Sequence, residues 1–223
     1  MTVTATIEDL LTRITGDEKH SPSANSTLDV LWVLYDRILR ITPETVDAPD
    51  RDRFLLSKGH GPAAYYAVLA AKGFIPEAWL DGLGTRMNHL GGHPDRVLVP
   101  GVEVGTGSLG HGLGLAVGTV LGLRAQGFLD SRVFVLLGDA ELDEGSNHEA
   151  IAYAAATKLP LTAIVIDNQS ATHGWPGGIA ARFPGFSTSI VDGRDHRAIE
   201  LALADRDRDR PHLVVATVEK KEY

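Results

Sequence analysis

Two side chains that carry oxygen ligands follow two apolar segments that have the length of buried strands. Asp139 comes two residues after RVFVLL, and Asn168 comes two residues after LTAIVI. Ligands of parallel sheets bind beyond the carboxyl ends of the strands, and a carboxylate beside an amide oxygen there would suit Mg²⁺ or Ca²⁺. Such an ion could hold a diphosphate whose oxygens also accept from backbone N–H groups at a glycine turn. An aspartate after a strand can equally be a helix cap, and this alternative stays open.

Histidines in glycine-rich turns are the next candidates for chemistry. His60 lies in SKGHG, and His93 lies in GGHP. His89 and His93 are four residues apart and could suggest a zinc site. The two glycines between them disfavour the helical turn that would align these side chains.

A third motif, GTGSLG, spans Gly105 to Gly110 and fits the dinucleotide fingerprint GxGxxG. A true fingerprint follows the first strand, and an acidic residue ends the next strand about 20 residues later. Asp130 has this distance but precedes RVFVLL instead of following it. An NAD-binding Rossmann protein is therefore a disfavoured alternative.

The elements that would position these residues alternate between strands and helices. Apolar spacing predicts a helix over residues 26–39, and FLLSKGHGPAAYYAVLAAKG indicates a short strand, a glycine turn and a helix that ends at Gly73. Residues 82–100 are expected to form a long loop, and a helix is expected over residues 109–123. Its glycines at 110, 114, 118 and 122 would form a bare stripe that another backbone could approach. RVFVLL and LTAIVI flank a helix through about Lys158, and candidate strands at 186–191 and 213–218 flank a helix over 196–204. The pattern predicts a single α/β domain over residues 1–223, with a mostly parallel sheet flanked by helices.

Composition narrows the classes of partner. The formal net charge of -8 argues against a general binder of nucleic acid or membrane surfaces, so small molecules and proteins are the expected partners. There are no cysteines, which excludes disulfides and thiolate metal sites. The first residues lack a basic segment before an apolar run, and no stretch approaches roughly 18 consecutive apolar residues. A cytoplasmic location is expected.

Several motifs, taken in order, resemble those of transketolases. The stretch from GDAELDEG to IDNQS is similar to the thiamine diphosphate motif of that family, which opens with Gly-Asp-Gly and closes about 30 residues later with Asn. SKGHG, GGHP and GTGSLGHGLGLAVG precede it in the family's order, and the segment that ends in VDGRDHRAIELAL follows it. The resemblance extends from about Leu10 to Val218 and implies the thiamine-diphosphate-binding fold, in its diphosphate-binding form.

The resemblance also implies roles for individual residues. The implied metal ligands are Asp139, Asn168 and the backbone carbonyl of Ser170, and the implied cofactor-binding residues are His60, Gly107, Leu109, Gly138, Asp139, Ala140, Glu144 and Asn168. The implied catalytic histidines, around the substrate, are His20, His60 and His93. His20 and His60 can also be ordinary loop histidines, and His111 stands where the family commonly has Gln.

Two departures from the family pattern qualify what the chain would do. Ala140 replaces the second glycine of Gly-Asp-Gly, which adds a methyl group but keeps the backbone N–H. The sequence ends at ATVEKKEY, without the pyrimidine-binding domain and its activating glutamate. The resemblance therefore implies a split enzyme, in which a partner subunit carries that domain in an α2β2 heterotetramer. With thiamine diphosphate and Mg²⁺ or Ca²⁺, the pair would transfer a two-carbon ketol unit from a ketose sugar to an aldehyde. A regulatory paralogue without turnover is the alternative.

Overall fold

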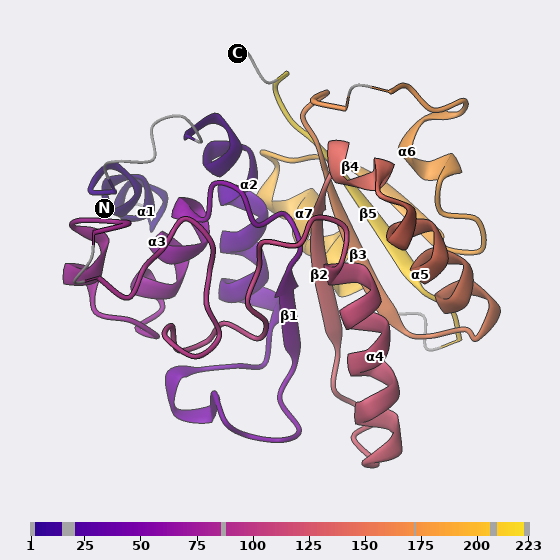
Figure 1. Cartoon of the computed structure of the whole chain (residues 1–223), viewed down its shortest axis with the longest axis horizontal. Coiled ribbons are helices and arrows are strands. Elements are labelled where there is room, and N and C mark those ends of the chain that lie inside the picture. Colours follow the sequence, from indigo (N-terminus) through magenta and orange to yellow (C-terminus); the bar gives the residue numbers. More distant parts are fainter. Residues whose placement is uncertain (1–2, 15–20, 86–87, 172, 206–208, 221–223) are drawn as a thin grey trace.

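The fold is an α/β sandwich that the computed structural model describes for residues 3–14, 21–85, 88–171, 173–205 and 209–220 (Figure 1). The helices are α1 Val3–Thr12, α2 Ser21–Val33, α3 Ala63–Ala71, α4 Gly112–Ala125, α5 Gly145–Ala156, α6 Gly178–Ala181 and α7 His196–Ala204. The strands are β1 Arg53–Leu56, β2 Val133–Gly138, β3 Leu161–Asp167, β4 Ser187–Asp192 and β5 His212–Thr217. A π-helical turn, η2 Leu34–Ile38, follows α2, and 3₁₀ turns lie at η3 Pro43–Thr45, η4 Glu77–Leu80 and η5 Ala140–Asp143.

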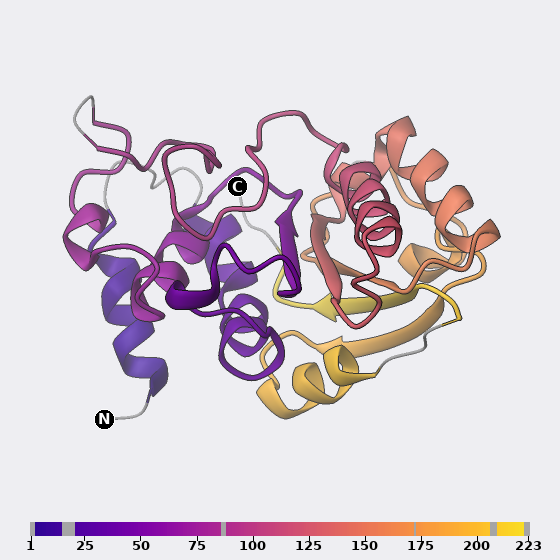
Figure 2. The same ribbon diagram turned by 90° about the horizontal axis from the view of Figure 1, so that it is seen from below.

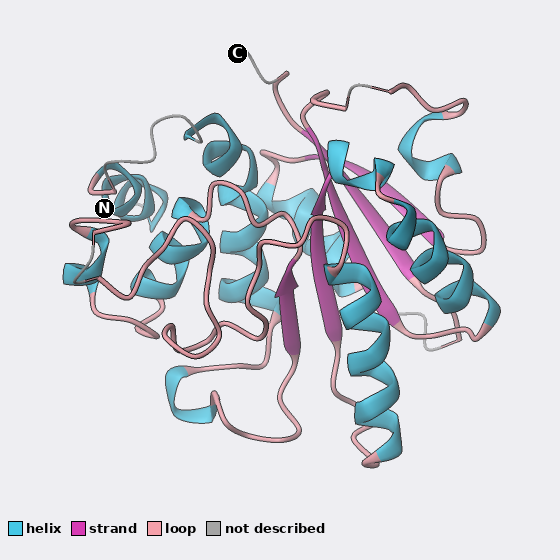
Figure 3. Ribbon diagram, in the orientation of Figure 1, coloured by secondary structure: helices cyan, strands magenta, loops and turns pink. Residues whose placement is uncertain are grey.

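The described strands form one parallel sheet in the order β1-β2-β3-β5-β4 (Figure 3). Every residue of β2 is buried, whereas β4 at the edge alternates between half-buried and exposed side chains. The register pairs Gly138, the last residue of β2, with Ile166 near the end of β3. Asp139 and Asn168 therefore follow neighbouring strand ends, and the predicted parallel α/β sheet is confirmed.

Two hydrophobic clusters cover the two faces of this sheet. One joins α2, α3 and α7 to side chains such as Phe134 and Ile164, and the other joins α4 and α5 to side chains such as Val135 and Val165. Alternate residues of one strand thus enter opposite clusters, because successive side chains of a strand point to opposite faces. Figure 2 shows α7 on one side of the strands and α4 with α5 on the other.

The helix after the long loop differs from its prediction. It begins at Gly112, and Gly110 lies before it with a φ of 80°. A Cβ built on Gly112 would meet Ser57 Cβ at 2.3 Å, so the close approach occurs at this end of the helix. Around Gly114, Gly118 and Gly122, no described atom comes within 4 Å of such a Cβ apart from the adjacent residues and the backbone of the helix itself. The stripe therefore faces open space within this chain.

The helix predicted over residues 26–39 begins earlier, at Ser21. Pro22 is its second residue, and proline is favoured in the first turn, where its missing N–H costs no helical hydrogen bond. The last turn widens to η2, in which Leu39 N donates to Leu34 O at 2.8 Å. Among the described residues, no helix combines the length and apolarity that crossing a bilayer requires.

Candidate functional site

Asp139 is a buried carboxylate at the carboxyl end of β2 that joins the ends of two strands. Its Oδ1 accepts from Ala140 N at 2.8 Å and from Ser170 Oγ at 2.5 Å. Its Oδ2 accepts from Ser170 N at 2.7 Å and from Ala171 N at 3.2 Å. The helix-cap alternative thus describes part of its role, because the carboxylate caps η5. The other contacts fix the loop that follows β3.

Asn168 provides the test of whether these residues fit a divalent metal. Its side chain is 2% exposed, and its Oδ1 has no hydrogen-bond partner. A buried amide oxygen without a partner costs about 1–3 kcal/mol, and a hard cation would satisfy it. The donor set therefore fits Mg²⁺ or Ca²⁺, provided that Asp139 exchanges some of its contacts with Ser170 and Ala171. No cluster of three or more His, Cys, Asp or Glu side chains offers another metal site in the described part of the chain.

The turn after β1 brings two of the predicted histidines together. The rings of His60 and His93 meet edge to face, with centroids 5.2 Å apart, and both side chains are exposed. Thr106 Oγ1 lies 3.4 Å from His93 Nδ1. A Cβ on Gly59 would approach Thr106 Oγ1 to 2.7 Å and His93 Nδ1 to 3.2 Å, so only glycine allows this contact between three separate segments.

The remaining histidines have different surroundings. His89 stacks on Trp79 with centroids 4.4 Å apart, away from the pair that His93 forms with His60, so the zinc alternative has no support. His111 is exposed at the start of α4, and its Nδ1 lies 3.0 Å from Leu109 O. His20 lies outside the described residues.

The loop from Gly105 to Gly110 leads into α4, and α4 precedes β2. A dinucleotide fingerprint directly follows a strand, whereas here α3 and a long loop separate β1 from the glycines. The geometry therefore disfavours the NAD alternative. Gly107 has a φ of 130°, and residues 107–109 of this loop are exposed. Glu144, Ala140 and Gly107 are also exposed, whereas Gly138 is buried.

Glu141 is a buried residue of the site that the sequence patterns did not single out. It is 3% exposed, and it accepts hydrogen bonds from Ser57 Oγ, from Gly110 N at 3.0 Å and from Gly138 N at 3.2 Å. Burial raises the pKa of Glu141 above its usual range, against the lowering effect of these donors. The spacing of Glu141 from Asp139 was visible in the sequence, but its inward direction was not.

Lys58 and Arg182 are two further side chains that the patterns missed. Lys58 Nζ donates to Ser23 O at 2.8 Å and to Ser23 Oγ at 2.7 Å, which ties the turn after β1 to α2. Arg182 pairs with Asp143 at 2.6 Å and lies over the ring of Trp175. With Asp139, Gln169 and other residues, Arg182 and Trp175 line a cavity of about 300 Å³.

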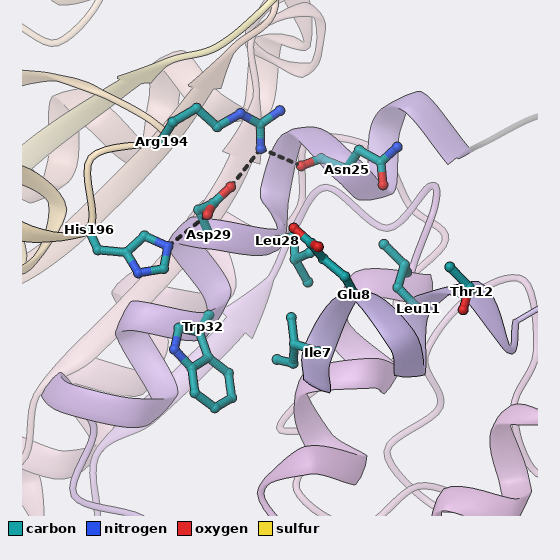
Figure 4. Close-up of a pocket in the computed structure, with 10 residues that line it drawn as sticks. All are labelled: Ile7, Glu8, Leu11, Thr12, Asn25, Leu28, Asp29, Trp32, Arg194 and His196. Atoms are coloured by element: carbon teal, nitrogen blue, oxygen red, sulfur yellow. Dashed lines mark hydrogen bonds and ion pairs between the residues drawn. The ribbon is translucent and has the colours of Figure 1, made fainter. Parts of the chain in front are cut away.

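A separate cavity of about 390 Å³ lies between α1, α2 and the turn from β4 to α7 (Figure 4). Its charged groups pair with one another, since Arg194 Nη1 lies 2.6 Å from Asp29 Oδ2 and His196 Nε2 lies 2.7 Å from Asp29 Oδ1. Arg194 also donates to Glu219. The hydrogen bonds to Glu219 and to Asp29 together raise the pKa of the Arg194 guanidinium. None of the predicted site residues within the described chain lines this cavity.

Comparison with protein families gives one match that spans most of the chain. The family model described as "Transketolase, thiamine diphosphate binding domain" matches residues 13–219. The chain is also similar to a crystal structure of transketolase from Campylobacter jejuni, with a TM-score of 0.75 and 25% identity over 97% of this chain and 38% of that one.

Curated relatives differ in how much of their own length this chain covers. The protein named "Ferredoxin fas2" from Rhodococcoides fascians is 56% identical over 95% of this chain and 71% of that protein. An apulose-4-phosphate transketolase subunit from Actinobacillus succinogenes is 36% identical over 90% of this chain and 76% of the relative. Human transketolase is 34% identical over 88% of this chain and 33% of its own length, so the chain spans about a third of such full-length relatives.

Proposed function

Because the chain belongs to the transketolase family through its thiamine diphosphate-binding domain, we propose that it is the diphosphate-binding subunit of a two-subunit transketolase. The observation that carries the proposal is the buried, unpartnered Oδ1 of Asn168 on the strand end next to Asp139. A divalent ion there would satisfy the amide oxygen and hold a diphosphate. Relatives that are named as single subunits of transketolases support the existence of a second chain. The name ferredoxin does not suit this chain, which has no cysteine to ligate an iron–sulfur cluster.

The proposed role of this chain is to hold the cofactor and to orient substrate. Thiamine diphosphate, when bound, supplies the chemistry that breaks and forms a carbon–carbon bond beside a carbonyl group. Asp139, Asn168 and the carbonyl of Ser170 would hold Mg²⁺, or Ca²⁺ in its place. Backbone groups at Gly138 and Ala140, with Gly107, Leu109 and Glu144 nearby, would line the cofactor.

Histidines of this chain would contact the substrate rather than the metal. His60 and His93 meet at one exposed turn, where two imidazoles could donate to substrate hydroxyls and to a developing oxyanion. His20 is proposed for the same role on the resemblance alone. The substrates would be a ketose donor of a two-carbon ketol unit and an aldehyde acceptor.

We propose that the partner supplies the pyrimidine-binding domain and the carboxylate that activates the cofactor, in an α2β2 assembly. Each active site would then lie between unlike subunits. The regulatory alternative draws on Ala140, which stands where the family has glycine; its N–H donates to Asp139 Oδ1 and would have to leave that contact to meet a diphosphate. A measurement of ketol transfer in the presence of the partner distinguishes the two-subunit enzyme from a regulatory paralogue.

The test is a calorimetric titration of the chain with thiamine diphosphate, in Mg²⁺ and in excess chelator. Binding should require the metal, because Asp139 and Asn168 would meet the diphosphate through the ion. Asp139→Ala should abolish binding, whereas Glu149→Gln, which alters an exposed carboxylate on α5, serves as the control. Equal affinity with and without chelator would contradict the proposal.

A further inference from the structure

We infer that Glu141 is a positioning residue, which holds the loop from Gly105 to Gly110 against the end of β2 in the conformation that receives the diphosphate. The inference rests on the proposed function, because it assigns the loop to the cofactor. It concerns a side chain that touches neither metal nor substrate in that proposal. The evidence lies in the segments that its carboxylate joins.

The carboxylate of Glu141 gathers donors from three segments that are far apart in the sequence. Oε1 accepts from Ser57 Oγ, in the turn after β1, and from Gly110 N, at the end of the glycine loop. Oε2 accepts from Gly138 N, the last residue of β2. Gly138 directly precedes Asp139, so one buried group ties the loop and the turn to the strand end that would hold the metal.

A second layer of contacts extends this arrangement to both flanking helices. Ser57 Oγ accepts from Gly112 N, the first residue of α4, at 3.1 Å. Asn147 Nδ2, on α5, donates to Glu141 O at 2.7 Å. Gly110 adopts a φ of 80°, and a Cβ there would meet Glu144 Cβ at 2.5 Å, so the loop can occupy only a narrow space. In this conformation the backbone N–H of Gly110 donates to Glu141 Oε1.

Only an acceptor suits the position of Glu141. Each of its side-chain contacts is a donor, and a glutamine would turn its own N–H₂ toward at least one of them. Burying a carboxylate costs several kcal/mol, which stability alone would not favour. Lys58 donates its Nζ hydrogen bonds to Ser23, and its positive charge favours the ionised form of Glu141 from nearby. We therefore assign to Glu141 the role of holding the conformation of the loop from Gly105 to Gly110.

The first measurement is residue-resolved amide hydrogen exchange at Gly110 and Gly112 in the whole chain without metal or cofactor. In Glu141→Gln, both amides should exchange about ten- to a hundredfold faster, the range expected for the loss of a hydrogen bond to a charged group. Glu149→Gln is the matched control, because Glu149 is exposed on α5 and should leave both rates unchanged. Ser57→Ala is a smaller change that should accelerate Gly112 alone, and it keeps the test valid if Glu141→Gln unfolds the chain.

The second measurement is the affinity for thiamine diphosphate with Mg²⁺. Glu141→Gln should bind about ten- to a hundredfold more weakly, by the same hydrogen-bond loss, and saturating cofactor should restore the protection of Gly110. Unchanged exchange in both variants, or faster exchange with the affinity of the unaltered chain, would overturn the inference. If the unaltered chain itself fails to bind thiamine diphosphate, the proposed function is wrong, and this inference falls with it. That outcome is read from the unaltered chain alone, so the two failures are distinguishable.

Discussion

Asn168 is a residue whose burial disfavours the folded state unless something binds its side-chain oxygen. Because Oδ1 has no partner in the protein and its burial costs about 1–3 kcal/mol, Asn168→Leu should not lower the free energy of unfolding in the absence of ligand and can raise it by up to about 3 kcal/mol. The same substitution should abolish the Mg²⁺-dependent stabilisation by thiamine diphosphate. Denaturant unfolding and thermal melts with and without cofactor measure the two effects. Full stabilisation of the variant by cofactor would exclude Asn168 as a ligand.

His93 belongs to a different function of the same site. His93→Ala should leave the affinity for thiamine diphosphate within about threefold, because the imidazole would contact substrate, and should lower kcat for ketol transfer by about 10²–10³ with a partner present. His89→Ala is the matched control, since His89 stacks on Trp79 instead. A loss of cofactor binding without a specific loss of turnover would assign His93 to the cofactor.

At the scale of elements, Asp52 connects the segment after η2 to the start of β2. Its carboxylate is fully buried and pairs with Arg40 at 3.0 Å and with Arg132 at 2.7 Å. Arg40 is 55% exposed and Arg132 is 22% exposed, so the substitution removes hydrogen bonds to charged groups, worth about 1.5–3 kcal/mol, without leaving a buried charge unpaired. Asp52→Asn should lose about this much stability at pH 7 in denaturant unfolding, whereas Asp50→Asn, at an exposed neighbour, should lose almost none.

The carboxylate of Asp52 should also make the free energy of unfolding depend on pH. Burial by itself raises the pKa of Asp52, but hydrogen bonds from Arg40 and Arg132 outweigh this effect and hold the pKa below its usual range. A lowered pKa in the folded state contributes stability above the unfolded value, about 3.9, and this stability disappears as the pH falls through the folded value. The difference in stability between the unaltered chain and Asp52→Asn should therefore shrink below about pH 4. A constant difference down to pH 2 would contradict this account.

At the scale of the whole molecule, the proposed half-site predicts weak binding by the chain alone. A ligand at about 100 times its dissociation constant adds about 2.7 kcal/mol, or very roughly 5–11 °C in Tm for a chain of this size. The lone chain would leave the pyrimidine ring in water, so its shift at modest cofactor concentration should be smaller. Cofactor and partner should each strengthen the binding of the other, as linkage requires. Thermal melts of the chain, the partner and the mixture measure this, and a full shift in the lone chain that the partner leaves unchanged would contradict the split site.

The sequence by itself determined the order of the five strands and of the helices between them, but not α1 or α6, and it determined the relation between Asp139 and Asn168. Apolar runs such as RVFVLL and LTAIVI indicate strands whose two faces are both buried. The carboxyl ends of parallel strands lie at the same edge of the sheet. The strands at 133–138 and 161–167 and the helix at 196–204 follow that prediction. These features depend on local periodicity and on one rule of topology, so they can be read along the chain.

Only the tertiary structure decided which groups meet across segments. Glu141 joins Ser57 across 84 residues and Gly110 across 31 residues, and His93 pairs with His60 while His89 does not. Local sequence periodicity carries no information on such pairings, because the direction of a side chain in a turn depends on the backbone dihedral angles of the turn and on what packs against it. The unpartnered Oδ1 of Asn168 is likewise a property of its surroundings, since the sequence states that an amide is present but not what lies within its reach.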